Sequence, residues 1–296
     1  MTAPRVLVLV PTISPTRVAA AAPWLTALRD PVAGFDVRIV ANAASVADHR
    51  LGWAAPVIDT GANPGFARSV SAAARAVGTW DWVVLLNDDL RFSPETPGRI
   101  RDAIRTADGT GGELIYFDPE SLRPLPDPSG VFLSLSLLES VASRLRRTPR
   151  DRAVGATYKS FSAVAIRRTA WDRCGGLDER FVFCFEDAYF ARRHLEGGGV
   201  EPQSIDVGLV HDRSTTTSRH IARVLPAVAF SARTYLRVTG TRALASDLLV
   251  LTALSIRLVL LPFASAVPLE HLRGVMSAMS AVLRRCEPPL PDYDRL

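Results

Sequence analysis

The 296-residue sequence has few cysteines, only one lysine, and no internal repeat or long low-complexity segment. Its three cysteines, Cys174, Cys184 and Cys286, are odd in number and form no CxxC pair, which disfavours a disulfide framework and a structural zinc site and indicates a reducing compartment. Neither GxxxxGK[ST] nor a GxGxxG after a strand is present, which disfavours a P-loop NTPase and a dinucleotide-dependent dehydrogenase.

A long apolar N-terminal run is also lacking. Residues 6–10 are apolar, but Pro11 ends the run after five residues. A signal peptide needs an apolar region of ~7–15 residues followed by small residues. The run therefore predicts a buried strand and a cytoplasmic protein.

Positive charge is concentrated in one segment. The formal net charge is +5, and residues 211–242 contain six arginines and one acid, Asp212, so the rest of the chain sums to zero. Such a segment predicts an anionic partner: phosphate, nucleic acid or an anionic membrane surface. Only Phe230 and Tyr235 interleave with these arginines, which disfavours nucleic acid.

The first 120 residues alternate between strand and helix patterns. Hydrophobic residues make up 48% of the chain and charged residues 22%, as in globular proteins of one or two domains. We expect strands at 6–10, 36–40, 57–58, 82–86 and 160–168, helices at 15–28, 66–77 and 186–196, and a loop at 119–128. This order predicts an α/β fold with a mostly parallel sheet, which binds ligands beyond the carboxyl ends of its strands.

The last third has a different character. Residues 248–263 are almost wholly apolar, but as a helix they would span ~24 Å of a ~30 Å hydrocarbon core and would place Arg257 within it. Residues 269–283 have an apolar stripe at helical spacing. Three interpretations stay open: packing on the preceding domain or on a second subunit of a homo-oligomer, an in-plane helix on an anionic membrane, and a true span. We divide the chain into a domain at 1–220 and a C-terminal helical region at 221–296.

Four groups of residues could carry chemistry. Asn87, Asp88 and Asp89 follow a buried strand, where repelling carboxylates would bind Mg²⁺ or Mn²⁺, although a polar turn looks the same. Glu186 and Asp187 follow an aromatic run, which suits general-base work, although acids also cap helices.

The other two groups are weaker alone. His211 ends an apolar strand and gains weight as a metal ligand only if Asp89 lies nearby; otherwise it is a core residue. The segment 63–69 places Gly65 and Arg68 at a helix start, where free N–H groups and positive charge favour an anion.

Taken in order, these motifs resemble family 2 glycosyltransferases of the GT-A fold, particularly the bacterial rhamnosyl- and galactofuranosyltransferase-like branch. The similar pieces are Asn63-Pro64-Gly65-Phe66-Ala67-Arg68, Leu85-Leu86-Asn87-Asp88-Asp89, Gly175-Gly176-Leu177-Asp178-Glu179-Arg180-Phe181, Phe185-Glu186-Asp187 with Arg192-Arg193, and Val210-His211-Asp212-Arg213-Ser214. They cover roughly residues 5–240, and the C-terminal helices resemble membrane-associated tails of that branch.

The resemblance implies an inverting, metal-dependent glycosyltransferase. In it, Asp89 and His211 would bind the divalent cation, and Asp187, with Glu186 beside it, would deprotonate the acceptor. The nucleotide sugar would contact Pro11, Thr12, Asn42, Gly65, Phe66, Arg68, Asn87 and Asp88. The implied donor is deoxythymidine diphosphate–rhamnose, and the implied acceptor is a glycan or a polyprenyl-diphosphate-linked sugar of the cell envelope. The region 211–285 would touch the inner face of the cell membrane.

Two positions depart from the family pattern. Ala41 replaces the usual acid before Asn42, and Ser71 replaces a frequent Asn. The resemblance places both changes on the nucleotide side. They imply either a different base preference or compensation by a nearby residue such as Asp48 or Asp59. Two other functions stay open: a sugar-phosphate nucleotidyltransferase and a non-catalytic nucleotide-binding protein of the same fold. The lack of a lysine-containing phosphate loop speaks against the nucleotidyltransferase.

Overall fold

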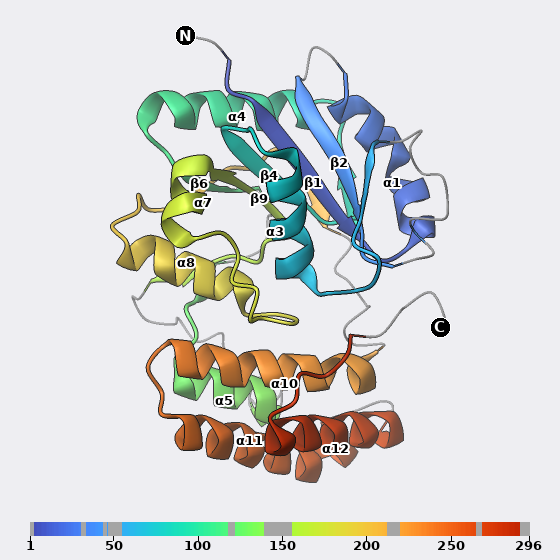
Figure 1. Cartoon of the computed structure of the whole chain (residues 1–296), viewed down its shortest axis with the longest axis vertical. Helices are drawn as coiled ribbons and strands as arrows, with labels where there is room; N and C mark the ends of the chain where they lie inside the picture. The colour runs from blue at the N-terminus through green and yellow to red at the C-terminus, as the bar shows by residue number, and fades with distance from the viewer. Residues whose placement is uncertain are drawn as a thin grey trace.

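The computed structural model describes residues 3–30, 34–43, 46, 55–117, 122–138, 156–211, 220–264 and 268–290. Two parts are stacked along the long axis of the molecule (Figure 1): a sheet with helices on both faces, and a separate layer of helices beneath it. The basic, proline-containing segment 144–152, which the sequence suggests is a connector, lies outside the described residues.

The central sheet is mixed and mostly parallel, as predicted. Its strand order is β10-β6-β9-β4-β1-β2-β3, and β9 runs antiparallel to both β4 and β6. The strands are β1 (Val6–Thr12), β2 (Phe35–Ala41), β3 (Val57–Asp59), β4 (Trp82–Leu86), β6 (Leu114–Tyr116), β9 (Ala163–Arg167) and β10 (Gln203–Ser204). The parallel pairing of β1 with β2 and β4 brings the carboxyl ends of these three strands to one edge.

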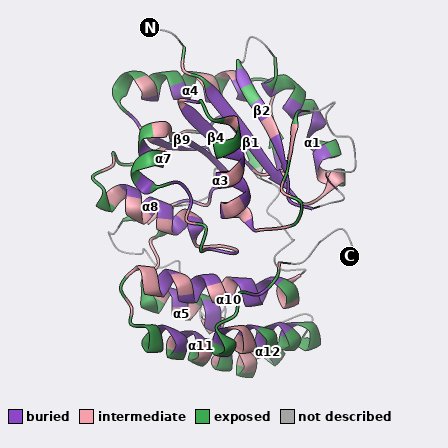
Figure 2. Ribbon diagram, in the orientation of Figure 1, coloured by how far each residue is buried: buried purple, intermediate pink, exposed green. Residues whose placement is uncertain are grey.

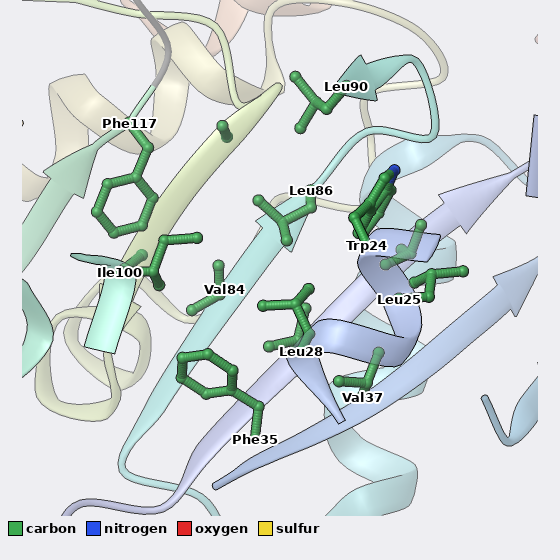
Figure 3. Close-up of a cluster of buried hydrophobic side chains, with 14 of the residues drawn as sticks. Trp24, Leu25, Leu28, Phe35, Val37, Val84, Leu86, Leu90, Ile100 and Phe117 are labelled. Atoms are coloured by element: carbon green, nitrogen blue, oxygen red, sulfur yellow. The ribbon is translucent and has the colours of Figure 1, made fainter. Parts of the chain in front are cut away.

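Alternating side chains of β1 enter two different cores, because successive residues of a strand point to opposite faces. Val8 and Val10 pack with α1 (Pro15–Leu28) and α4 (Thr96–Thr110), and Figure 3 shows part of this cluster around Trp24 and Leu28. Leu7 and Leu9 pack with α3 (Phe66–Val77), α7 (Arg168–Cys174) and α8 (Glu186–Glu196). The central strands β1 and β4 are therefore buried on both faces, as their purple colour in Figure 2 shows.

The predicted ends of three helices, at 15–28, 66–77 and 186–196, agree with α1, α3 and α8. The strand predicted at 160–168 is shorter in the structure, where β9 covers only Ala163–Arg167. The predicted loop at 119–128 contains the two-residue strand β7 (Arg123–Pro124), which pairs with β8 (Thr157–Tyr158).

The lower layer consists of α5 (Pro128–Ser136), α10 (Ile221–Val238), α11 (Ala243–Ala264) and α12 (Pro268–Arg284). These helices share an apolar core of their own. Asp247 of α11 accepts charged hydrogen bonds from Arg233 and Arg237 of α10 and from Arg285, which follows α12. Since α5 comes from the first 220 residues, the layer is not formed by the C-terminal region alone, and the domain division stays a prediction.

One helix in the described part of the chain, Ala243–Pro262, is long and apolar enough to cross a membrane, and 39% of this window is buried within the protein. Arg257 lies on its buried side, where Nε donates to His271 Nε2 at 2.8 Å and Nη1 donates to the carbonyl of Leu135 at 3.0 Å. α11 therefore has one face committed to packing against α5 and α12.

Candidate active site

A cavity of about 190 Å³ lies where β1, β2 and β4 end. The strand ends contribute Pro11, Thr12, Asn42, Asn87, Asp88 and Asp89, and the start of α3 contributes Gly65 and Phe66. All eight were predicted from the sequence. Asn63, from the segment 63–69 that the sequence singled out, also lines the cavity, together with Ile13, Arg17, Phe183 and Leu290, which were not predicted as site residues.

The Asp88 carboxylate is held by β1 and α1, which lie more than 70 residues earlier in the chain. It accepts a hydrogen bond from Thr12 Oγ1 at 2.6 Å and forms an ion pair with Arg17 Nη1 at 3.2 Å. Burial raises the pKa of Asp88, and Arg17 and Thr12 oppose this shift. Arg17 is the one charged residue of α1 and lies in its first turn, where positive charge is unfavourable without an acidic partner. That position was the signal that sequence reasoning missed.

The loop before α3 passes close to the segment before α8. Gly65 has a φ of 96°, and a Cβ there would lie 2.3 Å from the carbonyl oxygen of Val182. Only glycine fits this conformation and this approach. Nearby, Asn42 donates to Ser69 Oγ at 3.0 Å, which joins the end of β2 to α3.

Two residues predicted on the nucleotide side lie elsewhere. The described cavity lining contains neither Arg68 nor Ser71. The guanidinium of Arg68 binds both carboxylate oxygens of Glu287 and the carbonyl of Glu179, and this hydrogen bonding with Glu287 raises the pKa of Arg68. The placement of Ser71 was wrong, because it is buried and faces the carbonyl of Leu177 at 3.3 Å.

The predicted compensation for Ala41 has no support from Asp59, which is exposed and accepts a hydrogen bond from the N–H of Gly61. Asp48, the other residue considered, lies outside the described residues.

Glu186 and Asp187 occupy the first turn of α8, directly after a strained backbone segment. Cys184 and Phe185 both have left-handed φ values, 66° and 71°, which cost energy in residues other than glycine and often mark functional sites. Burial, and then repulsion from Asp187, raises the pKa of Glu186 to about 8. Burial therefore favours the neutral form of Glu186, and the half-buried Asp187 is the better candidate for a base.

The donor set beside the cavity fits a hard divalent cation. Asn87, Asp88 and Asp89 line one wall with oxygen ligands, and His211 lies opposite Leu90 where β11 (Leu209–His211) pairs with β5 (Leu90–Phe92). The side chain of His211 lies outside the described residues. Within those residues, no three His, Cys, Asp or Glu side chains are grouped to hold an ion. Mg²⁺ is usually held by one or two carboxylates together with substrate phosphates, so this set suits an ion that binds with a diphosphate.

Comparison with known proteins agrees with the resemblance drawn from the motifs. The chain is 26% identical, over 196 aligned positions, to an N-acetylglucosaminyl-diphospho-decaprenol L-rhamnosyltransferase of Mycobacterium tuberculosis. The alignment covers 58% of this chain and 63% of that protein, so the chain spans less than two thirds of its curated relative. No family model matches the chain.

Solved structures establish the fold. One is a mannosyltransferase from Pyrobaculum calidifontis, determined with GDP-Man and Mn²⁺. The match covers 96% of this chain and 88% of the mannosyltransferase, with a TM-score of 0.50 and 16% identity. Glucosyl-3-phosphoglycerate synthase from Mycobacterium tuberculosis, determined with Mn²⁺ and UDP-Glc, is matched over 81% of both chains, with a TM-score of 0.52 and 14% identity. The chain has the GT-A fold, as predicted.

Proposed function

We propose that this GT-A-fold chain, which is similar to rhamnosyltransferases, is a glycosyltransferase that uses a nucleotide-sugar donor and a divalent cation. The observation that carries the proposal is the cavity at the ends of β1, β2 and β4, where Asp88 and Asp89 face the glycine loop before α3. Parallel sheets bind ligands at this edge. The nucleotide would lie against Pro11, Thr12 and Asn42, with its diphosphate near Asn87 and Asp88.

The cation would be held by Asp89 and His211, with Asp88 near the diphosphate. When bound, it would neutralise the charge that grows on the leaving diphosphate. The chain's own residues orient the donor: Thr12 and Arg17 fix the Asp88 carboxylate, and Gly65 lets the loop before α3 approach Val182 closely.

Asp187 would take the proton of the acceptor hydroxyl as the oxygen attacks the anomeric carbon and the nucleoside diphosphate leaves. A base on the face opposite the leaving group gives one displacement with inversion. Glu186 is buried beside it, and its raised pKa favours the neutral form, which limits the negative charge at the site. We expect Asp187→Asn to abolish transfer while nucleotide binding is retained. Full activity in that variant would refute the base assignment.

The donor and acceptor follow from the relative. Its name describes rhamnose transfer to a diphospho-decaprenol-linked sugar. We propose the same classes here: deoxythymidine diphosphate–rhamnose as the donor and a polyprenyl-diphosphate-linked glycan as the acceptor, in the synthesis of cell-envelope polysaccharide.

A lipid-linked acceptor would be reached from a membrane surface. Leu244, Leu248 and Val259 of α11 are 56–70% exposed, and Leu269, Met276 and Leu283 of α12 are 54–75% exposed. Arg273 and Arg284 lie exposed on the same helix as the second group. An apolar face with basic residues is typical of a helix that lies in the plane of an anionic membrane. Flotation with anionic liposomes tests this proposal, and a protein that stays wholly soluble at low salt contradicts it.

The first experiment is calorimetric binding of a panel of nucleoside diphosphates with and without Mn²⁺. Metal-dependent binding of one pyrimidine diphosphate, lost in Asp89→Ala, would support the donor site and identify the base despite Ala41. No binding to any of them by folded protein would favour the non-catalytic alternative.

A further inference from the structure

A second cavity, of about 530 Å³, lies between α10 and α12. Its remaining wall is the C-terminal segment 286–290, which leaves the end of α12 and rises past α10 toward the start of α3 (Figure 1). Much of its lining is apolar, from Ala222 and Pro226 of α10 to Pro288 of the C-terminal segment. We call this cavity the helical groove.

Two guanidinium groups at the helical groove carry uncompensated charge. Arg223 of α10 and Arg284 of α12 both line it, and neither has an ion-pair partner among the residues that the structure describes. The neighbouring Arg233, Arg237 and Arg285 are paired with Asp247. The one carboxylate of the lining, Glu287, is occupied by Arg68. Ser277 and Ser280 add hydroxyl donors.

The helical groove adjoins the candidate active site through one residue. Leu290 lines both cavities, and its Cδ1 atom lies 3.3 Å from the position that a Cβ on Gly65 would take. A ligand in the helical groove would therefore end beside the donor cavity. α12 also exposes Met276 and Leu283, which do not line the helical groove.

We infer that the helical groove binds the diphosphate and the first isoprenoid units of a lipid-diphosphate acceptor. Arginine is the usual recognition group for phosphate oxygens, and the apolar wall accommodates the hydrocarbon chain. The inference rests on the proposed function and deepens it, because it gives the acceptor a site distinct from that of the nucleotide.

Farnesyl diphosphate is a soluble probe of this chemistry, and its binding to the full chain is measured by calorimetry. We expect the Arg223→Ala/Arg284→Ala variant to bind it at least ~10-fold more weakly than the unaltered protein, and Arg223→Lys/Arg284→Lys to recover part of the affinity. Arg273→Ala is the matched control, since Arg273 is exposed on α12 but does not line the helical groove. Inorganic diphosphate and farnesol separate the contribution of charge from that of the apolar wall.

Three results would overturn the inference: no binding of farnesyl diphosphate to folded protein, unchanged binding by the double alanine variant, or an equal loss in Arg273→Ala. Nucleoside diphosphate binding is measured on the same preparations. If the protein binds a nucleoside diphosphate but the groove variants do not change farnesyl diphosphate binding, only this inference is refuted. If the unaltered protein binds no nucleoside diphosphate, the proposed function is refuted instead.

Discussion

The hydroxyl oxygen of Ser231, in the middle of α10, accepts hydrogen bonds from the backbone N–H groups of Val182 and Phe183, both at 3.1 Å. This contact joins the helical layer to the segment that leads into Glu186 and Asp187. Phe183 also lines the cavity at the ends of β1, β2 and β4. The helical layer therefore positions the candidate catalytic segment as well as covering it.

Removing that hydroxyl should weaken both stability and activity. In Ser231→Ala, two N–H groups, one of them fully buried, lose their acceptor, which should lower the free energy of unfolding by about 2 kcal/mol and reduce kcat. Ser255→Ala is the control, because Ser255 is exposed on α11 and bonds only within its helix. Denaturant unfolding of both variants measures the difference. Equal small losses would show that Ser231 has no positioning role.

The close approach at Gly65 predicts a second effect. In Gly65→Ala, the new Cβ would meet the carbonyl of Val182 at 2.3 Å, so the loop before α3 must move and nucleoside diphosphate binding should fall at least ~10-fold. Gly61→Ala also places a side chain at positive φ, 73°, but meets nothing within 4 Å. It should cost about 1 kcal/mol of stability and leave binding intact. Similar binding by the two variants would contradict the role of the contact.

Glu113 should stabilise the fold against acid. The Arg173 guanidinium, with the Val200 N–H, lowers the pKa of Glu113 from 4.5 to about 2. The unfolded chain then takes up a proton at higher pH than the folded one, so the stabilisation is present above pH 4.5 and is lost as the pH falls toward 2. Because Arg173 is 31% exposed, we expect about 2 kcal/mol.

Glu113→Gln should therefore be destabilised at pH 6 and resemble the unaltered protein near pH 2. Urea unfolding across this range measures the difference. Glu196→Gln removes an exposed pair with Arg192 and should show little change at either pH.

His271 predicts a separate loss of stability at milder acidity. Its buried Nε2 accepts from Arg257, and burial, with the charge of Arg257, lowers the pKa of His271 from 6.5 to about 4. Protonation is thus easier in the unfolded chain, and stability should fall by up to about 3 kcal/mol as the pH drops from 6.5 to 4. His271→Gln keeps an acceptor without titrating, so its stability should change less over this interval. Parallel pH profiles would refute the assignment.

Several features of this protein were determined by the sequence alone. Continuous apolar strands, followed by turn residues and Ala-rich helices, predict a sheet covered by helices on both faces. The structure contains the predicted strand β1, buried along its length, and the predicted helices α1, α3 and α8. The polar residues at strand ends were predicted as a site because parallel strands bring their carboxyl ends to one edge. These predictions depend on periodicity and chain order, which are local properties.

Only the tertiary structure decided the contacts between distant segments. Arg68 follows the glycine turn like an anion ligand, yet it pairs with Glu287, 219 residues away. In the sequence, Arg257 counts only against a membrane span. Its acceptors, the carbonyl of Leu135 and the ring of His271, come from other segments of the chain. A side chain's partner depends on which surfaces pack together. The spacing of residues along one segment carries no information about a partner that belongs to a distant segment. The partners of these two arginines are therefore determined by tertiary packing alone.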